Sequence, residues 1–577
     1  ALSLIAARVP WLSGRVYSLT WAVAFLAGLF TLVTADRLLF LHPRRWVLSL
    51  ALVSGAVLFT QLAATVVAAC MRRKPAPVAR LAAALLAGAL VPIGIVLFPA
   101  VGRGGATEDA PSVLLISADA LRADYCSVYG GQVPTPALDN LARRGVRFDR
   151  CYALAPWTLP ALNGMLTSKY PPGFAPGGEE AQAARPETYA LIPSYWKEGE
   201  GLSFPKRIEA QGYVTAAFVG NTLMNQPWLI DEFGAARVAG ARTIDRIRLF
   251  SRLPMLRNAI MWVAPSAVTE RPLDTTRWLS AYARQFLRHY RGRPFFLWVH
   301  FFDPHAPYTP PQPYHADGQG AYWSVAPALN AELLGFWEHG LSPEDKRIIQ
   351  GLYEDEIRYV DDTVGHLIDG LDNLGLADTT HIWFTADHGE ELWDHGNWSH
   401  GQSLYDELVR VPLIAAGPGV VPRVVSEPVS MIDAIPTLTD LLRAERSPGW
   451  RGRSLASVLF DEAAAPPRQP CYSQATVGPF FSHGRAAMVG RMTVSGDYKL
   501  IRDLDTGREE LYDVRQDPDE NRDLRDARDA LARGLGRGLD EWAASFPASF
   551  EDLDQGVIAD TPSDDMIDAF RAMGYMN

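Results

Sequence analysis

Three long stretches in the first 103 residues contain no charged side chain, and they constrain this chain more than any other feature. They are Val16–Ala35, Trp46–Met71 and Leu81–Gly102. A helix needs about 20 predominantly apolar residues to cross a bilayer, and each stretch meets that length. Basic residues border the stretches, which is typical of membrane spans rather than buried core helices. A cleaved signal peptide fits poorly, because two further apolar stretches follow the first. We therefore predict a transmembrane region over residues 1–103.

The charge of the chain changes sign after this region. Residues 1–103 carry ten Lys and Arg and one acid, whereas residues 104–577 carry 44 basic and 64 acidic side chains. The basic loops place the N-terminus inside the cell and the large remainder outside it. We expect a multi-pass protein of the cell membrane, with the lipid bilayer as a partner and an extracytoplasmic (periplasmic or extracellular) domain. The acidic balance argues against nucleic-acid binding, and four Cys exclude a disulfide framework.

The rest of the chain alternates short β-rich runs with helical runs. Strands are predicted at Ser112–Ser117, Tyr213–Val219, Phe295–Phe301, His381–Thr385 and Pro412–Ala415. Helices are predicted at Thr135–Gly145, Thr158–Thr167, Asp274–Arg291, Ser342–Leu374 and Met431–Leu442. Strands separated by helices indicate an α/β fold, with a mostly parallel sheet covered by helices on both faces.

A different pattern begins near residue 466. Residues 485–502 alternate apolar and polar side chains, with a turn at Ser495–Asp497. This pattern predicts a small antiparallel sheet, followed by a helix over Asn521–Ser545. We therefore divide the extramembrane part into a domain over residues 104–465 and a C-terminal sub-domain with its tail over residues 466–577.

Acidic and imidazole side chains follow three of the predicted strands. Asp119 follows the first strand, and His300, Asp303 and His305 end or follow the third. The fourth is followed by Asp387-His388-Gly389-Glu390. Ligands bind at the carboxyl ends of parallel strands. Oxygen and nitrogen ligands at one sheet edge favour a metal site for Zn, Mn or a harder ion. A lone Asp119 is equally well explained as a helix cap.

A hydroxyl lies between these groups along the chain. Thr158 precedes a predicted helix whose first turn contains Pro160, which makes Thr158 an N-cap. Such a residue has two interpretations. It either only caps the helix, or it is a nucleophile beside the positive helix end, where an anionic ester and a metal would meet.

Several segments, taken in order, resemble the sulfatase family of the alkaline phosphatase superfamily over about residues 111–520. The matching segments are Ser112–Asp124, Thr135–Phe148, Leu166–Pro171, Gly212–Asn221, His300–Tyr308, Thr385–Glu390, Val429–Thr437 and Glu510–Asn521. The resemblance implies an alkaline-phosphatase-like sheet and a C-terminal antiparallel sub-domain. It also implies a catalytic domain over residues 104–465.

Two departures refine the resemblance. True sulfatases carry Cys-x-Pro-Ser-Arg, whose Cys becomes formylglycine, whereas this chain has Thr158-Leu-Pro160-Ala-Leu. The paired aspartates after the first strand are reduced to Asp119-Ala120. Both changes look like the branch with a Thr nucleophile. That branch contains lipoteichoic acid synthases, phosphoethanolamine transferases and nucleotide pyrophosphatases/phosphodiesterases.

The resemblance also implies roles for individual residues. Asp119, Thr158, Asp387 and His388 would bind a divalent metal, with Zn, Mn, Mg or Ca as one or two ions. Thr158 would be the catalytic nucleophile. His305 and His400 would contact the substrate or a second metal, and a structural loop role is the alternative for His400.

The expected function follows from these roles. We expect a membrane-anchored, metal-dependent hydrolase or transferase that acts on phosphate esters through a covalent Thr158 intermediate. Its substrate would be a lipid-linked or envelope anionic ester. One alternative is a sulfuric ester hydrolase, and the other is an inactive member that binds an anionic polymer. The sequence leaves open whether His300, Glu390, Glu391, Asp394 and His395 orient ligands, and whether Cys126 pairs with Cys151.

Overall fold

The computed structural model describes residues 110–170, 203–224, 227–238, 275–318, 320–322, 324–325, 341–475 and 489–545. The chain divides into two units, Ala1–Gly104 and Gly105–Asn577. The predicted spans 16–35, 46–71 and 81–102 lie outside the described residues, so membrane anchoring stays a prediction. Within the described ranges, no helix combines the length and apolar character that a bilayer crossing requires.

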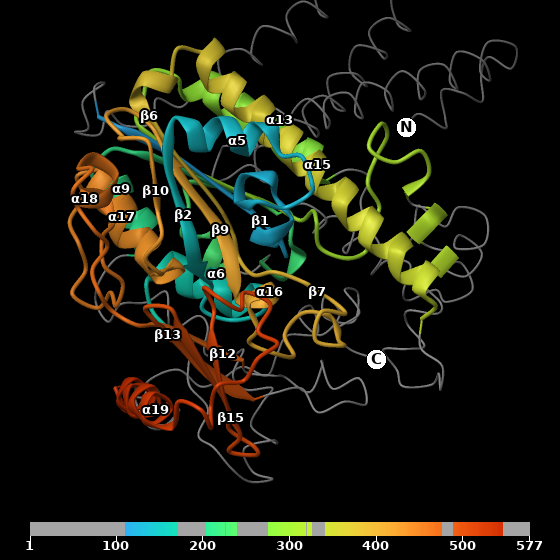
Figure 1. Cartoon of the computed structure of the whole chain (residues 1–577). Coiled ribbons are helices and arrows are strands. Elements are labelled where there is room, and N and C mark those ends of the chain that lie inside the picture. The colour runs from blue at the N-terminus through green and yellow to red at the C-terminus, as the bar shows by residue number, and fades with distance from the viewer. Residues whose placement is uncertain are drawn as a thin grey trace, which may run out of the picture. The chain divides into compact units, whose positions relative to one another are not determined.

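A nine-stranded sheet forms the core of the described part (Figure 1). Eight strands follow the order β10-β2-β9-β6-β1-β5-β3-β4, and β11 pairs with β2. Their bounds are β1 Ser112–Ala118, β2 Gly145–Tyr152, β3 Val214–Val219, β4 Ala235–Val238, β5 Phe295–Phe301, β6 Thr380–Ala386, β9 Arg410–Ala416, β10 Arg423–Val425 and β11 Val429–Ser430. Only β9 runs antiparallel to its neighbours β2 and β6 in this described sheet. The predicted α/β fold with a mostly parallel sheet is therefore confirmed.

Helices cover both faces of the sheet, as predicted. Their bounds are α5 Pro136–Arg143, α6 Thr158–Thr167, α9 Phe204–Ala210, α10 Pro227–Ile230, α13 Thr275–Tyr290, α15 Pro343–Asn373, α16 Asp406–Val409, α17 Ala434–Leu441 and α18 Ala456–Phe460. Neighbouring residues of a strand point to opposite faces. On β5, Phe295 packs edge-on against Phe286 of α13, and Phe296 packs against Phe204 of α9. These two aromatic pairs show that α13 and α9 cover opposite faces (Figure 1).

Strand β2 was not predicted, and its polar residues explain why. Arg147, Asp149 and Arg150 interrupt its apolar pattern, and the pairing with β9 shifts register between Phe148 and Cys151. Arg147 and Asp149 pair with each other at 2.7 Å in partly exposed positions. Period-two alternation is lost wherever such a bulge occurs, so sequence periodicity misses the strand.

The C-terminal sub-domain is an antiparallel sheet, as predicted. It runs in the order β12-β13-β14-β15, with bounds Cys471–Ala475, Gly490–Ser495, Tyr498–Asp503 and Glu509–Asp513. The predicted turn lies at Gly496, whose φ of 62° suits glycine. The following helix, α19, spans Asp529–Ala544 and begins eight residues later than expected.

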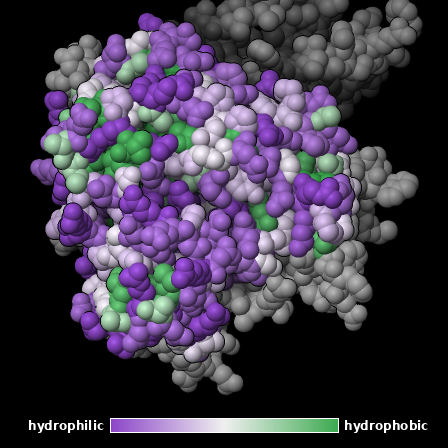
Figure 2. Space-filling view, viewed as in Figure 1, coloured by the Kyte–Doolittle hydropathy of each residue, from purple (hydrophilic) through white to green (hydrophobic). Residues whose placement is uncertain are grey.

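Buried apolar residues join this sub-domain to the large domain. One cluster combines Tyr152, Leu404 and Leu408 with Met492 and Ile501 of the small sheet. Elsewhere, the face in Figure 2 is mostly hydrophilic where it is described, with small apolar areas. The disulfide alternative is wrong, because buried Cys126 and Cys151 are both free thiols.

A buried ion triad also connects the two parts. The Lys499 ammonium lies 2.8 Å from Asp406 Oδ1 and 2.9 Å from Glu520 Oε1, and Lys499 has no exposed side-chain surface. Breaking a buried pair leaves uncompensated charge and costs about 3–5 kcal/mol.

We predict that Lys499→Met lowers the free energy of unfolding by about 3–5 kcal/mol, because it strands two buried carboxylates. Urea denaturation measures this change. The exposed pair Arg347–Glu344 provides the control, since Arg347→Ala should cost less than about 1 kcal/mol. Equal losses in the two variants would contradict the assignment of Lys499 as a buried structural cation.

Candidate active site and metal centre

The two aspartates predicted to bind metal meet at one sheet edge. Strands β1 and β6 are parallel neighbours with Ala118 opposite Ala386, so Asp119 and Asp387 leave the sheet side by side. Both are buried. Asp387 Oδ1 accepts hydrogen bonds from the backbone N–H groups of Ala120 (3.2 Å) and His388 (2.9 Å). Ala120 adopts φ 60°, an uncommon conformation for alanine that directs its N–H to this carboxylate.

The close approach of two carboxylates creates electrostatic strain. Burial raises the pKa of Asp387 well above its usual value, and the charge of Asp119 raises it further. Asp119 stays the ionised partner, because neighbouring imidazoles outweigh its burial and hold its pKa below the usual range. A cation between the two groups would remove the like-charge repulsion that keeps Asp387 protonated.

His388 presents one ring nitrogen to these carboxylates. Its Nδ1 lies 2.7 Å from the carbonyl oxygen of Gly389, which can only accept, so Nδ1 carries the proton. Burial lowers the pKa of His388, which leaves Nε2 with a free lone pair. Nε2 lies 3.5 Å from Asp119 Oδ1 and 3.6 Å from Asp387 Oδ2. A Cβ on Gly389 would lie 1.9 Å from the Glu407 carbonyl oxygen, so only glycine permits this turn.

Thr158 completes the group, although not as the predicted N-cap. Trp157 is the N-cap of α6, and Thr158 is its first helical residue. The Thr158 hydroxyl makes no cap bond to the helix. It lies 3.2 Å from His388 Nε2 and 3.4 Å from Asp119 Oδ1. The predicted N-cap position is therefore wrong, and the nucleophile role of Thr158 stays a prediction.

The spacing of these four residues fits a metal ion. Ligands about 2.0–2.2 Å from a tetrahedral centre lie roughly 3.3–3.6 Å apart. The Thr158 oxygen lies 3.2 Å from His388 and 3.4 Å from Asp119, and His388 Nε2 lies 3.5 Å from Asp119 and 3.6 Å from Asp387. Asp387 Oδ2 is buried without a hydrogen-bond partner, as expected of an atom reserved for a cation. Carboxylate and imidazole donors suit Zn or Mn.

His300 lies in the same centre, which the sequence left open. Its Nε2 lies 3.4 Å from Asp119 Oδ2, and its Nδ1 lies 2.9 Å from Ser117 Oγ. One ligand atom each from Asp119, His300 and Asp387 lies within 4.8 Å of the others. The pairing of Ser117 with His300 across β1 and β5 brings His300 here. That register cannot be read from one sequence.

Asn221 also contacts this centre, and sequence reasoning assigned it no role there. Its Oδ1 accepts from the Leu223 N–H at 2.9 Å, which fixes the orientation of the amide. Its Nδ2 therefore donates to Asp119 Oδ2 at 2.7 Å and points to Thr158 Oγ1 at 3.4 Å. The available signal was its position just after strand β3, at the same edge as Asp119.

The other two predicted catalytic residues lie beside His388. The His400 ring centroid is 4.5 Å from that of His388 and 4.8 Å from that of His305. His305 Nδ1 donates to the Ala306 carbonyl at 2.5 Å, and burial lowers the pKa of His305. The structure thus brings together the predicted metal ligands and catalytic residues, whereas Asp303 accepts a hydrogen bond from Thr276 of α13 instead.

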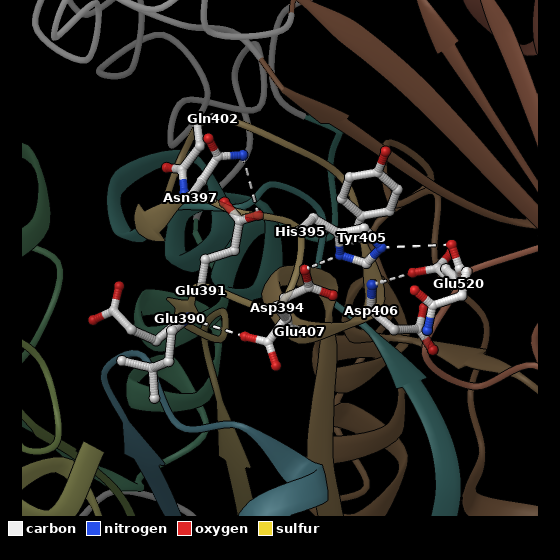
Figure 3. A network of polar contacts seen from close by, with 12 residues as sticks. Glu390, Glu391, Asp394, His395, Asn397, Gln402, Tyr405, Asp406, Glu407 and Glu520 are labelled. Atoms are coloured by element: carbon white, nitrogen blue, oxygen red, sulfur yellow. Dashed lines mark hydrogen bonds and ion pairs between the residues drawn. The ribbon is translucent and has the colours of Figure 1, made fainter. Parts of the chain in front are cut away.

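A second group near the site, Glu391, His395 and Glu407, also has ligand atoms close together. Figure 3 shows Glu391 directed toward Gln402, and His395 between Glu407 and Glu520. His395 donates from Nδ1 to Glu407 at 2.6 Å and from Nε2 to the Glu520 carbonyl at 3.5 Å. Both ring nitrogens are therefore donors, so His395 links the site loop to the C-terminal sub-domain and is not a metal ligand.

This chain is similar to known proteins in both sequence and fold. A family model described as Sulfatase matches residues 111–444, and one described as N-sulphoglucosamine sulphohydrolase, C-terminal, matches residues 394–537. An uncharacterized sulfatase of Escherichia coli is 26% identical over 72% of this chain and 83% of its own length. An N-acetylglucosamine-6-O-sulfatase of Bacteroides thetaiotaomicron is 24% identical over 71% of this chain and 82% of its own length. The phosphonate monoester hydrolase of Agrobacterium radiobacter shares the fold, with a TM-score of 0.53 and 22% sequence identity. The match covers 75% of this chain and 95% of that structure.

Because Asp119 and Asp387 repel each other, we predict that the effect of Asp387→Asn on the melting temperature has opposite signs without and with metal. Without metal, Asp387→Asn should raise the melting temperature at pH 8, because it removes the cost of keeping a buried carboxyl protonated far above its ordinary pKa beside the charged Asp119. With Mn²⁺ present, the same variant should melt below the wild type, because a ligand is lost. Thermal denaturation in EDTA and in Mn²⁺ measures both.

Asp361 supplies the control for this experiment. It is a buried carboxylate that accepts from the Ala137 and Leu138 N–H groups of α5. Asp361→Asn should change the melting temperature by the same amount in EDTA and in Mn²⁺, because Asp361 lies outside the centre. A metal-independent change of the same kind for Asp387→Asn would contradict the metal centre.

The His395 contacts predict a pH dependence of stability. Burial alone would lower the pKa of His395, but its hydrogen bond to Glu407 raises the pKa to about 9. The folded state therefore holds this proton more tightly than the unfolded chain. The resulting stabilisation is complete below about pH 6.5 and is lost as the pH rises to about 9.

His395→Phe, which can retain the ring stacking at 3.7 Å on Tyr405, should remove this part of the pH dependence. Melting temperatures between pH 6 and 9.5 measure it, with an expected loss on the order of 1–2 kcal/mol after discounting for solvent. Parallel curves for the wild type and the variant would contradict the ion pair.

Proposed function

The chain belongs to the sulfatase family, and we propose that it is a metal-dependent hydrolase of tetrahedral oxyanion esters with Thr158 as its nucleophile. One observation carries the proposal. The Thr158 hydroxyl lies within 3.2–3.4 Å of His388, Asp119 and Asn221, in a buried centre whose carboxylates need a cation. A residue that only capped the helix would instead direct its hydroxyl toward the backbone N–H groups of the first helical turn.

Sulfuric esters are the first candidate substrates. The matching family model and the named relatives support sulfuric ester hydrolysis better than the phosphate transfer expected from the sequence. Such an ester carries a compact anion, which suits a site that combines a cation with hydrogen-bond donors.

Phosphoric esters are the second candidates, and the identity of residue 158 favours them. A threonine hydroxyl forms an ester with the transferred group, and a second in-line attack at phosphorus can resolve such an ester. The fold shared with a phosphonate monoester hydrolase is compatible with this candidate.

The residues of the chain suggest a sequence of steps. Asp119, Asp387 and His388, with His300 adjacent, would hold a divalent ion beside Thr158. When bound, the ion would act as a Lewis acid that withdraws charge from the ester oxygens. Asn221 orients the Thr158 oxygen, whose proton passes to the Asp119 carboxylate that it faces, because His388 Nε2 would be committed to the ion. Thr158 attacks sulfur or phosphorus, the bond to the alcohol breaks, and His305 or His400 donates a proton to the leaving oxygen. Water then releases the acid and restores Thr158.

The setting of this reaction remains part of the proposal. The charge-free stretches before residue 104 support a membrane anchor, with the site outside the cytoplasm. An anchored site would reach lipid-linked or envelope anionic esters at the bilayer surface. Transfer to an acceptor alcohol differs from hydrolysis only in what resolves the Thr158 ester.

We predict that Thr158→Ala lowers kcat by roughly 10³-fold or more on any ester the protein hydrolyses, because the attacking atom is gone. The assay compares 4-nitrophenyl sulfate with bis(4-nitrophenyl) phosphate in the presence of Mn²⁺. Thr158→Ser keeps the hydroxyl and should retain substantial activity. Full activity of the alanine variant would refute the covalent route, and the preferred ester decides between the two candidates.

A further inference from the structure

Glu390 is a buried carboxylate that the proposed mechanism does not use. It comes two residues after His388 and has no exposed surface. Its Oε1 lies 2.8 Å from His400 Nδ1, and its Oε2 lies 2.9 Å from the Tyr308 hydroxyl. Each carboxylate oxygen therefore has a separate donor, one on either side.

The direction of both hydrogen bonds follows from the chemistry of the groups. A carboxylate accepts, so His400 donates from Nδ1 and Tyr308 donates from its hydroxyl. Tyr308 is fully buried, and its ring packs edge-on against Tyr353 at 5.7 Å and Tyr322 at 6.1 Å. This packing fixes the phenol, which in turn fixes the second oxygen of Glu390.

The backbone of Glu390 is anchored as well. Arg122 Nη1 donates to the Glu390 carbonyl at 3.2 Å. The same guanidinium pairs with Asp394 at 2.6 Å and with Asp124 at 2.7 Å, and it is almost fully buried. The carboxylate that holds His400 therefore has a rigid base, as a group that sets the orientation of another side chain requires.

His400 is the side chain that gains from this rigidity. Its ring lies next to those of His388 and His305, and His388 in turn contacts the nucleophile. A ring held at Nδ1 can rotate little, so its Nε2 edge faces away from Glu390 in one defined direction.

We propose that Glu390, braced by Tyr308, is the positioning residue that fixes the orientation of the His400 ring beside the Thr158 nucleophile. This inference rests on the proposed function, because it assigns His400 to the ester side of the site. Residues that orient a functional histidine in this way typically change affinity or activity by 10–100-fold when they are removed.

A double-mutant cycle tests the proposal in the full-length protein. Kinetics are measured with whichever of 4-nitrophenyl sulfate and bis(4-nitrophenyl) phosphate the wild type hydrolyses. Glu390→Ala should lower kcat/KM roughly 10–100-fold in the wild type. In a His400→Ala background it should change kcat/KM by less than about 2-fold, since the residue through which it acts is gone.

Two further variants separate positioning from folding. Glu390→Gln should retain more activity than Glu390→Ala, because its amide oxygen can still accept from His400 while its NH₂ group meets the Tyr308 oxygen. Glu391→Gln is the matched control, since Glu391 is a buried neighbour that contacts Gln402 and Asn397. An equal loss from Glu390→Ala with and without His400 would overturn the proposal.

A binding measurement makes the result independent of turnover. Calorimetry with inorganic sulfate and with inorganic phosphate should give weaker binding for Glu390→Ala than for wild type, and no difference between the two in the His400→Ala background. If the wild type hydrolyses neither ester, the proposed function fails, and this binding cycle still decides the role of Glu390. Binding that depends on His400 but not on Glu390, or on neither residue, would overturn the inference.

Discussion

The close approach of two buried carboxylates is the constraint on which the rest of this structure depends. The parallel pairing of β1 and β6 places Asp119 and Asp387 at one sheet edge, where water cannot screen their charges. The surrounding groups reduce this cost. Asn221 and two backbone N–H groups donate to the pair, whereas the neutral His388 turns a lone pair toward it and supplies no positive charge. These groups do not fully compensate the negative charge of the centre, so a metal cation fits there. A bound cation could in turn activate the neighbouring Thr158 hydroxyl.

The loop that carries these groups is held from two directions. Residues 387–407 contain His388, Glu390 and His400, and Arg122 binds this loop from the side of β1. Lys499 and Glu520 hold it from the C-terminal sub-domain, and His395 adds a contact to the Glu520 carbonyl. The sub-domain therefore contacts the loop that carries the candidate site, through buried charges and through the Glu520 carbonyl.

The sequence predicted those site residues whose position follows from local patterns. It did not predict those whose position depends on how neighbouring strands pair. Buried strands such as β1 and β6, and the polar residues at their ends, follow from apolar runs, so Asp119, Asp387 and His388 could be predicted. Thr158 was identified as a candidate, but its expected capping bond was wrong, because Trp157 caps the helix. His300 and Asn221 required the pairing of β5 and β3 with their neighbours, which one sequence does not specify. The phosphate preference rested on two local departures, at Thr158 and at Asp119-Ala120, and the family comparisons favour sulfuric esters instead.

A crystal structure of the protein grown with Mn²⁺ and orthovanadate would test the central claim most directly. The account predicts an anomalous manganese signal between Asp119 and Asp387, in contact with His388, and vanadium bonded to Thr158 Oγ1. Manganese bound elsewhere, or vanadate held away from the Thr158 hydroxyl with the two aspartates hydrogen-bonded only to each other, would contradict it.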